Sequence, residues 1–270
     1  MSAEQLDPTA LEREWREWRR EHERQLSDPH GLLAATGLHW LTSEPTRFDD
    51  VPGAWSTSNG GVCVDLADGE TLTRGAVTLS GTHNFGVIED GPGVMATFDD
   101  AVVEIAKRGV RDMIRPRHPD HALVRNYRGT PTFPFDVRWR VTGRINPFES
   151  PQSVTVDASV EGLHHVYEAP GQVEFELDGA THRLTAFSDG DSFDILFRDV
   201  TSGVTTYGAT RALAVEAPDD GGRVTLDFNR ATNLYCAYTD FSTCPLPPPE
   251  NRLSVAIEAG EKIPYERHVA

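Results

Sequence analysis

The sequence predicts a mainly β protein, an antiparallel barrel or sandwich preceded by an N-terminal amphipathic helix. Short runs of alternating apolar and polar residues recur along the chain after residue 41. Many lie about 8 to 12 positions apart, which is the spacing typical of sandwiches and barrels. Gly, Pro, Asp and Asn separate the runs and favour turns between strands. Helical periodicity is clear only near the N-terminus.

The N-terminal helix is expected to begin at Asp7 and to end near Asp28. Asp7 can cap it, Pro8 suits its first turn, and Thr9 with Glu12 forms a capping-box pattern. An aromatic-rich stripe follows at intervals of three and four, formed by Leu11, Trp15, Trp18, His22 and Leu26. We expect this stripe to pack on the rest of the chain, because apolar stripes usually serve a chain's own core. A partner-binding helix is the alternative.

Nine runs are candidate strands: 62–66, 76–79, 94–98, 102–105, 137–141, 173–177, 184–187, 193–197 and 224–228. The clearest hairpin is VEFELDGATHRLTAF, in which Asp178-Gly179 has the residue types that tight hairpin turns favour. A turn at 201–203 is expected to lead into a further strand over 204–210. Together these runs would form a meander.

The sequence indicates three regions. Residues 1–41 hold the helix and a linking segment, 42–148 a small β module, and 149–270 a barrel or sandwich with an unusual tail. Pro147 and Pro151 bracket the proposed boundary between the last two regions.

The net charge argues against nucleic-acid binding. With 42 Asp and Glu against 25 Lys and Arg, the chain carries a formal charge of -17, whereas phosphate binding depends on clustered cations. Lys107 and Lys262 are the only lysines. A GC-rich genome and a salt-adapted acidic surface both account for this bias, and we hypothesise a halophilic protein.

The first residues are charged and lack an apolar core, so we expect neither a signal peptide nor a membrane span. A cytoplasmic location follows. There Cys63, Cys236 and Cys244 would ordinarily be reduced, although a bridge between the last two is geometrically possible.

The segment from Asp227 to Glu261 is the candidate site. It is rich in prolines and polar side chains and has little periodicity. Asn donates and accepts hydrogen bonds and Arg presents a planar fork, so these types can orient a small polar or anionic molecule. The candidate residues are Asp227, Asn229, Arg230, Asn251 and Arg252, with Tyr207 and Arg211 from a preceding strand. A structural clasp, in which the same groups bond the chain's own backbone, is the alternative.

Cys236 and Cys244 join the candidate set because they lie in the same segment. Their separation of eight positions is too long for a zinc knuckle, so buried structural thiols are the preferred interpretation. The run RPRHPDH, from Arg115 to His121, is expected to be a solvated loop and not a metal site. We expect no metal and no cofactor.

Several motifs resemble one family. They are WREWRREHERQL and GLHWL near the start, the residues Arg125, Tyr127, Gly129, 133–136, Trp139 and Arg140, the run FRDVTSGVTTYGATR, and the closing blocks DFNRATNLYCAY, CPLPPPENRL and AIEAGEK. Together they resemble the DUF1684 family of bacterial and archaeal proteins of unknown function. The resemblance implies a shared β-rich fold and brings no reaction with it. Residues 42–82 match only loosely, and Thr232 and Leu234-Tyr235 depart from the more proline-rich pattern.

Three classes of function remain open. A binding protein would hold a small molecule in a pocket between barrel and tail. A hydrolase-like enzyme would need Cys236, Cys244, Asp227 or Asp136 beside a base or acid. A structural or interaction protein would use the tail as a clasp. We favour the first, and the oligomeric state stays open.

Overall fold

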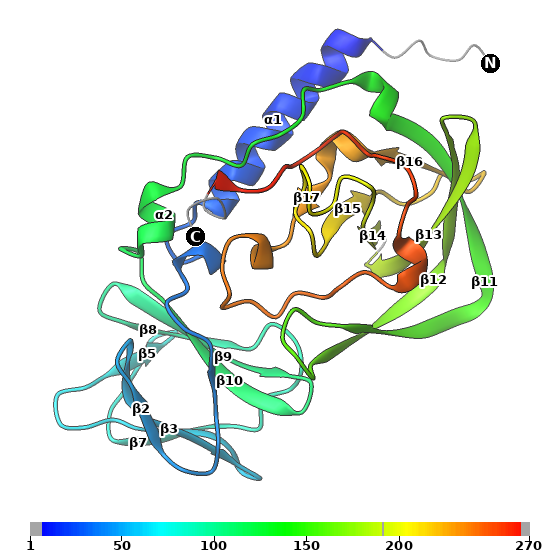
Figure 1. The fold of residues 1–270 in the computed structure, drawn as a ribbon. Coiled ribbons are helices and arrows are strands. Elements are labelled where there is room, and N and C mark those ends of the chain that lie inside the picture. The colour runs from blue at the N-terminus through cyan, green and yellow to red at the C-terminus, as the bar shows by residue number, and fades with distance from the viewer. Residues whose placement is uncertain (1–6, 191, 266–270) are drawn as a thin grey trace. The chain divides into compact units, whose positions relative to one another are not determined.

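The computed structural model describes residues 7–190 and 192–265. Within these residues the chain forms two compact units (Figure 1). The first comprises residues 7–24, 129–238 and 244–265, and the second comprises residues 25–128 and 239–243. The candidate segment therefore belongs almost entirely to the first unit.

A seven-stranded antiparallel sheet forms the first unit. Its strand order is β16-β11-β12-β13-β14-β15-β17. The bounds are β11 Arg140–Asp157, β12 His164–Leu177, β13 Ala180–Asp189, β14 Ser192–Phe197, β15 Arg211–Val215, β16 Arg223–Asp227 and β17 Thr232–Asn233. Helix α1 is Pro8–Leu26, and the short 3-10 helices are η2 Val137–Trp139, η3 Phe228–Arg230, η4 Tyr235–Ala237 and η5 Pro249–Asn251.

The second unit holds two sheets, of orders β1-β10-β9-β8-β5-β6 and β2-β3-β4-β7. Their strands are β1 His39–Trp40, β2 Thr46–Phe48, β3 Val51–Ser58, β4 Gly61–Asp65, β5 Leu72–Arg74, β6 Val77–Leu79, β7 Thr82–Gly86, β8 Val94–Phe98, β9 Ala101–Arg108 and β10 Arg111–Arg117, with η1 Leu32–Ala34 and α2 Ala122–Asn126. Both sheets contribute to one buried core, in which Trp55 of β3 and Ile105 of β9 are fully buried. This unit is thus a sandwich.

The predicted fold class is confirmed. All pairings between named strands are antiparallel among the described residues, and the helix precedes them. In the described part of the first unit no pairing joins β16 to β15 or β17, so the sheet is not a closed barrel. Of the two architectures considered, the sandwich fits.

The helix begins as predicted, with a simpler cap than the sequence pattern indicated. The Asp7 carboxylate accepts a hydrogen bond from the Thr9 N–H at 3.0 Å, and the Asp7 carbonyl accepts one from the Leu11 N–H at 3.1 Å. Asp7 is therefore the capping residue. Thr9 lies inside the first turn and is not the cap of a capping box.

The predicted hairpin is confirmed as β12 and β13. Leu177 pairs with Ala180, and the two residues between them have positive φ, 51° at Asp178 and 76° at Gly179. A two-residue turn with both residues in this region follows the right-handed twist of the strands.

Two predicted strands are wrong in part. Over 204–210 the chain turns, because the Thr201 carbonyl accepts hydrogen bonds from the N–H groups of residues 204, 205 and 206, and a strand begins only at Arg211. Over 137–139 the chain forms η2, because the Asp136 carboxylate accepts the Arg138 N–H at 2.9 Å. The strand there starts at Arg140.

Residues 146–152, where the sequence suggested a boundary, lie inside β11. The register shifts between Pro147 and Gln152, so the prolines mark an irregularity within one strand. The division of the chain into residues 1–41, 42–148 and 149–270 stays a prediction.

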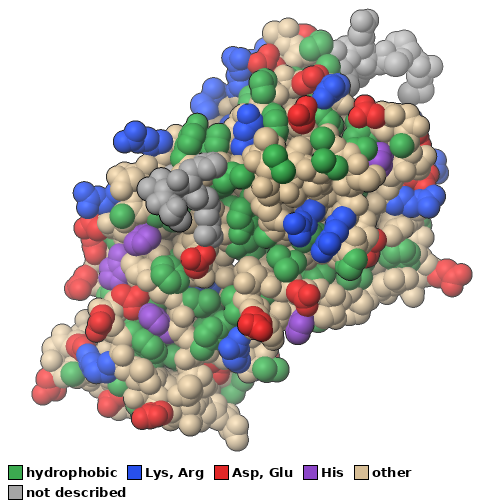
Figure 2. Space-filling view, in the orientation of Figure 1, with side chains coloured by type: hydrophobic (Ala, Val, Ile, Leu, Met, Phe, Trp, Pro, Cys, Tyr) green, Lys and Arg blue, Asp and Glu red, His purple; other side chains and the backbone are tan. Residues whose placement is uncertain are grey.

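The surface carries charges of both signs. Figure 2 shows carboxylate and guanidinium groups interspersed on the visible face. None of the helices in the described residues combines the length and apolar character needed to cross a membrane.

Candidate functional site

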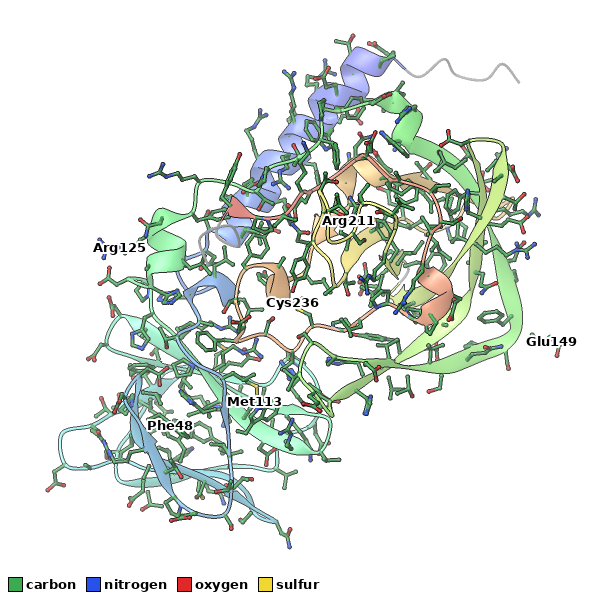
Figure 3. All side chains as sticks on the ribbon, viewed as in Figure 1. Phe48, Met113, Arg125, Glu149, Arg211 and Cys236 are labelled. Carbon is green, nitrogen blue, oxygen red and sulfur yellow. The ribbon has the colours of Figure 1, made fainter. Side chains whose placement is uncertain are left out.

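The tail from Asp227 to Glu261 packs against the seven-stranded sheet. Its apolar residues Leu253, Ile257 and Ala259 are buried in the same core cluster as the inward-facing residues of that sheet. Figure 3 shows two of the candidate residues, Arg211 and Cys236, on β15 and the tail. The apolar residues anchor the tail, and the polar residues between them occupy specific positions.

Asn251 bridges two strands at the point where their pairing ends. Strands β13 and β14 pair only as far as Phe187 and Asp194. Beyond that point the fully buried Asn251 side chain donates to the carbonyl groups of Thr185 and Leu196, at 2.9 and 2.8 Å, and accepts the Thr185 N–H at 2.7 Å. The amide replaces the missing strand partner, so these three hydrogen bonds of the side chain serve the fold.

Asn229 joins the tail to the segment before η2. Its side chain accepts the Asp136 N–H at 3.1 Å and donates to the Asp136 carbonyl at 3.0 Å. The backbone carbonyl of Asn229 accepts the Trp15 indole N–H of α1 at 2.9 Å. This buried residue thus links three segments of the first unit.

Arg211 is an internal crosslink. Its guanidinium, 1% exposed, pairs with the buried carboxylate of Asp199 and donates to the carbonyls of Ile257 and Ala259, at 3.2 and 2.5 Å. Burial lowers the pKa of Arg211, and the Asp199 charge opposes that shift. The arginine holds the end of the tail to β15.

The two tail cysteines are buried thiols. The Tyr207 hydroxyl donates to the Cys236 carbonyl at 2.7 Å, and the Cys236 N–H donates to the Cys244 sulfur at 3.3 Å. The interaction with Cys244, together with burial, raises the pKa of the Cys236 thiol. In contrast to these residues, Arg252 is exposed.

Asp227 and Arg230 line a cavity of about 590 Å³ together with Arg140. The Asp227 carboxylate lies 3.6 Å from the Arg140 guanidinium and 3.7 Å from Arg230 Nε, both longer than a hydrogen bond. Its other oxygen accepts the Asn229 side-chain N–H at 2.9 Å. Two guanidinium groups and one carboxylate therefore meet at the cavity.

Arg230 has unused hydrogen-bonding capacity. Its Nε–H is buried and donates to no acceptor within the described residues. The guanidinium lies 5.5 Å from the Trp18 ring of α1, a distance at which a cation is attracted to the ring face. The cavity is also lined by Glu14, Glu216 and the ion pair of Arg223 with Asp219.

A buried charged cluster that sequence reasoning missed lies between α1 and the tail. The Glu261 carboxylate, 1% exposed, pairs with Arg19, lies 3.2 Å from His22 Nε2 and accepts the Asn233 N–H at 2.6 Å. Burial by itself would raise the pKa of Glu261, but the hydrogen bond to His22 and the charge of Arg19 outweigh it and lower the pKa. No local motif signals a pair 242 positions apart.

The expectation of a solvated loop over RPRHPDH is wrong for Arg115 to Arg117, whereas residues 118–121 form a turn in which Asp120 is exposed. Arg115 and Arg117 belong to β10 of the second unit, where both pair with the buried Glu104. The imidazoles of His118 and His121 contact the carbonyls of Asp50 and Leu33, at 2.8 and 3.1 Å. The two arginines have a structural role, because they form ion pairs with the buried Glu104 carboxylate.

Comparison with known proteins adds a family and one related structure. The profile described as a protein of unknown function (DUF1684) matches residues 125–262. The solution NMR structure of an uncharacterized protein of Haloarcula marismortui is 33% identical, with a TM-score of 0.44, over 53% of this chain and 80% of that one. No curated protein matches. The chain belongs to the DUF1684 family.

Proposed function

We propose that the protein binds a small polar molecule carrying one acidic group, held by Arg140 and Arg230 in the cavity at the start of the tail. The observation that carries this proposal is the pair of partly buried guanidinium groups, 27% and 34% exposed, around a single carboxylate. With Asp227 these two groups sum to +1, whereas the whole lining, with Glu14, Glu216, Asp219 and Arg223 added, sums to −1, so the attraction for a monoanionic group is local to Arg140 and Arg230. Arg230 Nε–H supplies a donor without an acceptor among the described residues.

The other residues that line the cavity restrict the class of ligand further. Glu14 and Glu216 add negative charge to the cavity wall, so a multiply charged anion would be repelled. Thr142 and Thr225 offer hydroxyl groups that can donate or accept. A monocarboxylate with neutral polar groups fits this set better than a polyphosphate does.

The other candidate residues contribute to this site indirectly. Asn229 fixes η3 and thereby the position of Arg230, while Asn251, Tyr207 and Arg211 hold the tail to the sheet. In this proposal the clasp residues hold the tail in place and thereby position the residues of the binding site. A hydrolase mechanism through Cys236 has less support, because a thiol with a raised pKa stays protonated near neutral pH.

Thermal melting with a panel of small molecules tests the proposal. The panel contains monocarboxylates, dicarboxylates, sugar phosphates and uncharged polyols. A bound monocarboxylate at about 100 times its dissociation constant should stabilise the native state by about 2.7 kcal/mol. Stabilisation by polyols alone, or by no member of the panel, would remove the support for an acidic ligand.

Charge-removing variants locate the site. Arg140→Gln and Arg230→Gln should each weaken binding of the stabilising carboxylate by about tenfold or more, since each loses a charge-assisted hydrogen bond. Arg183→Gln is the matched control, because Arg183 is an exposed arginine paired with Glu174 on β12 and β13. Equal affinity in all three variants would place the ligand elsewhere.

A further inference from the structure

The floor of the proposed binding cavity is formed by alternate residues of two paired strands. Arg140 lies opposite Asp227 and Thr142 opposite Thr225 in the β11–β16 register, and all four residues line the cavity. Successive residues of a strand point to opposite faces of a sheet, so these four side chains share one face. The floor therefore presents a guanidinium, a carboxylate and two hydroxyl groups to the same space.

Two carboxylates that form no ion pair within the described residues, Glu14 and Glu216, also line this cavity. Glu216 directly follows β15. Glu14 lies on α1 four residues before Trp18, whose ring centre is 5.5 Å from the Arg230 guanidinium. Side chains four positions apart are neighbours on a helix, so Glu14 lies beside the ring that Arg230 contacts. Acceptors for a cation therefore lie in the same cavity as the guanidinium groups.

The charges of the lining leave an excess of carboxylates once an acidic group is bound. Arg223 pairs with Asp219, so the charges of these two residues cancel. The two guanidinium groups and the one carboxylate around Arg140 sum to +1, which a single ligand carboxylate neutralises. Glu14 and Glu216 then remain uncompensated. They repel a ligand that carries only negative charge and attract one that also carries a positive group.

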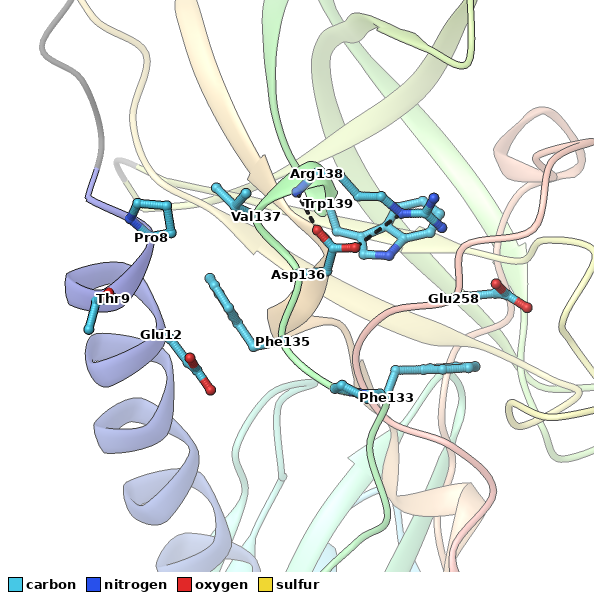
Figure 4. Close-up of a pocket in the computed structure, with 11 residues that line it drawn as sticks. Pro8, Thr9, Glu12, Phe133, Phe135, Asp136, Val137, Arg138, Trp139 and Glu258 are labelled. Atoms are coloured by element: carbon cyan, nitrogen blue, oxygen red, sulfur yellow. Dashed lines mark hydrogen bonds and ion pairs between the residues drawn. The ribbon is translucent and has the colours of Figure 1, made fainter.

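A second cavity of the first unit, of about 520 Å³, lacks this arrangement. Arg138 is the one cation among its described lining residues. Its guanidinium lies 3.4 Å from the Asp136 carboxylate and 4.4 Å from the centre of the Trp139 ring (Figure 4). The chain's own groups therefore already engage this cation, and we assign no ligand to this cavity.

We propose that the ligand of the cavity at Arg140 and Arg230 is a zwitterion with one carboxylate and one ammonium group. This inference rests on the proposed function and specifies the group that accompanies the carboxylate. Arg140 and Arg230 hold the carboxylate, and the buried Nε–H of Arg230 donates to no acceptor in the described part of the chain. The ammonium group lies toward Glu14 and Glu216, whose oxygens accept its N–H donors.

Isothermal titration of the full chain with matched pairs of ligands tests the charge requirement. Each pair joins an amino acid to the hydroxy acid of the same length: glycine with glycolate, β-alanine with 3-hydroxypropanoate, and 4-aminobutyrate with 4-hydroxybutanoate. In the pair that binds most tightly, at low salt and neutral pH, the amino acid should bind about tenfold more tightly than the hydroxy acid. Hydroxy acids that bind equally well or better would overturn the zwitterion and leave the proposed acid site intact. Binding of no member of any pair would overturn both.

Variants of the two carboxylates should change the affinities for the two kinds of ligand differently. Glu14→Gln combined with Glu216→Gln should weaken binding of the amino acid by about fivefold or more, because the ammonium group loses its counter-charges. The same double variant should bind the hydroxy acid at least as tightly as the original protein does, since the repulsion is removed. Glu17→Gln is the matched control, because Glu17 is an exposed carboxylate of α1 outside the lining. An unchanged affinity for the amino acid, an equal loss for both ligands, or an equal loss in the control would contradict the assignment.

Discussion

At the scale of single residues, the tail contains side chains that serve the fold and side chains that face a cavity. Asn251 and Arg252 are neighbours in sequence but differ most in the burial of their side chains. The first is fully buried and hydrogen-bonded to β13 and β14, whereas the second is exposed. The sequence placed both in one polar set, because residue type alone does not reveal which side chain points inward.

Replacing Asn251 should therefore be costly, and replacing Arg252 should not. Asn251→Ala leaves two carbonyl groups and one N–H of the strands without partners, so we expect a loss of about 4 kcal/mol in the free energy of unfolding. Arg252→Ala should stay within about 0.5 kcal/mol of the original protein. Urea unfolding measures both. A mild effect of Asn251→Ala would mean that water replaces the amide.

The thiols offer a second test at this scale. Cys236 and Cys244 are buried, and the pKa of Cys236 is raised, whereas Cys63 of β4 is partly exposed. Alkylation of the native protein at about pH 8 should modify Cys63 first and the two tail cysteines only after unfolding. Peptide mass spectrometry assigns the sites. Rapid labelling of Cys236 would show that the tail opens readily.

At the scale of elements, α1 is held to the tail by aromatic and charged contacts together. The Trp15 indole N–H donates to the Asn229 carbonyl, and Glu261 pairs with Arg19 and lies beside His22. The aromatic stripe was predictable, since its spacing is local. The contact between the helix and Glu261 was not predictable, because the periodicity of a helix does not reveal which residues of the chain pack against it.

This docking should weaken in acid. The pKa of Glu261 is lowered from its ordinary value of 4.5, so the folded state binds the proton less readily than the unfolded chain does. The corresponding stability is fully present above about pH 4.5 and is lost as the pH falls through the lowered pKa.

Glu261→Gln removes that dependence. The variant should lose about 3 kcal/mol at neutral pH, because it removes the buried carboxylate charge that pairs with Arg19 and lies beside His22. Its unfolding free energy should also fall less steeply than that of the original protein below about pH 4.5. Urea unfolding at several pH values compares them. Parallel curves would show that other carboxylates dominate the acid response.

Local chemistry explains which elements the sequence predicted. The β12–β13 hairpin follows from alternation and from Asp178-Gly179, and the cap of α1 from Asp7. The prediction of a strand over 204–210 was wrong because Thr201 stabilises a turn there. Its carbonyl accepts hydrogen bonds from the following N–H groups, and its hydroxyl lies 2.8 Å from the Thr206 hydroxyl. The cavity at Arg140 depends on chain segments that are far apart in the sequence, and no sequence pattern joins them.

At the scale of the whole molecule, charge is the dominant feature. The formal charge is -17, and the lysines number only two, Lys107 and Lys262. Mutual repulsion among carboxylates destabilises a compact acidic chain at low ionic strength, and salt screens that repulsion. A salt-adapted protein is the hypothesis that follows.

Salt should therefore stabilise the fold. We expect the midpoint of thermal unfolding to rise by several degrees between low salt and molar KCl, as screening relieves repulsion in the native state. Scanning calorimetry across a KCl series gives the answer. A midpoint that is the same at both ends would rule out salt adaptation and leave genomic composition as the explanation for the scarce lysines.

Native mass spectrometry of the purified protein tests the proposed binding function most directly, because it detects any retained ligand by its mass alone. The original protein should show an added mass from a singly acidic small molecule, and the double variant Arg140→Gln, Arg230→Gln should show none while it remains folded. An empty original protein that also stays empty with every monocarboxylate offered, or a ligand that the double variant retains in full, would contradict the account.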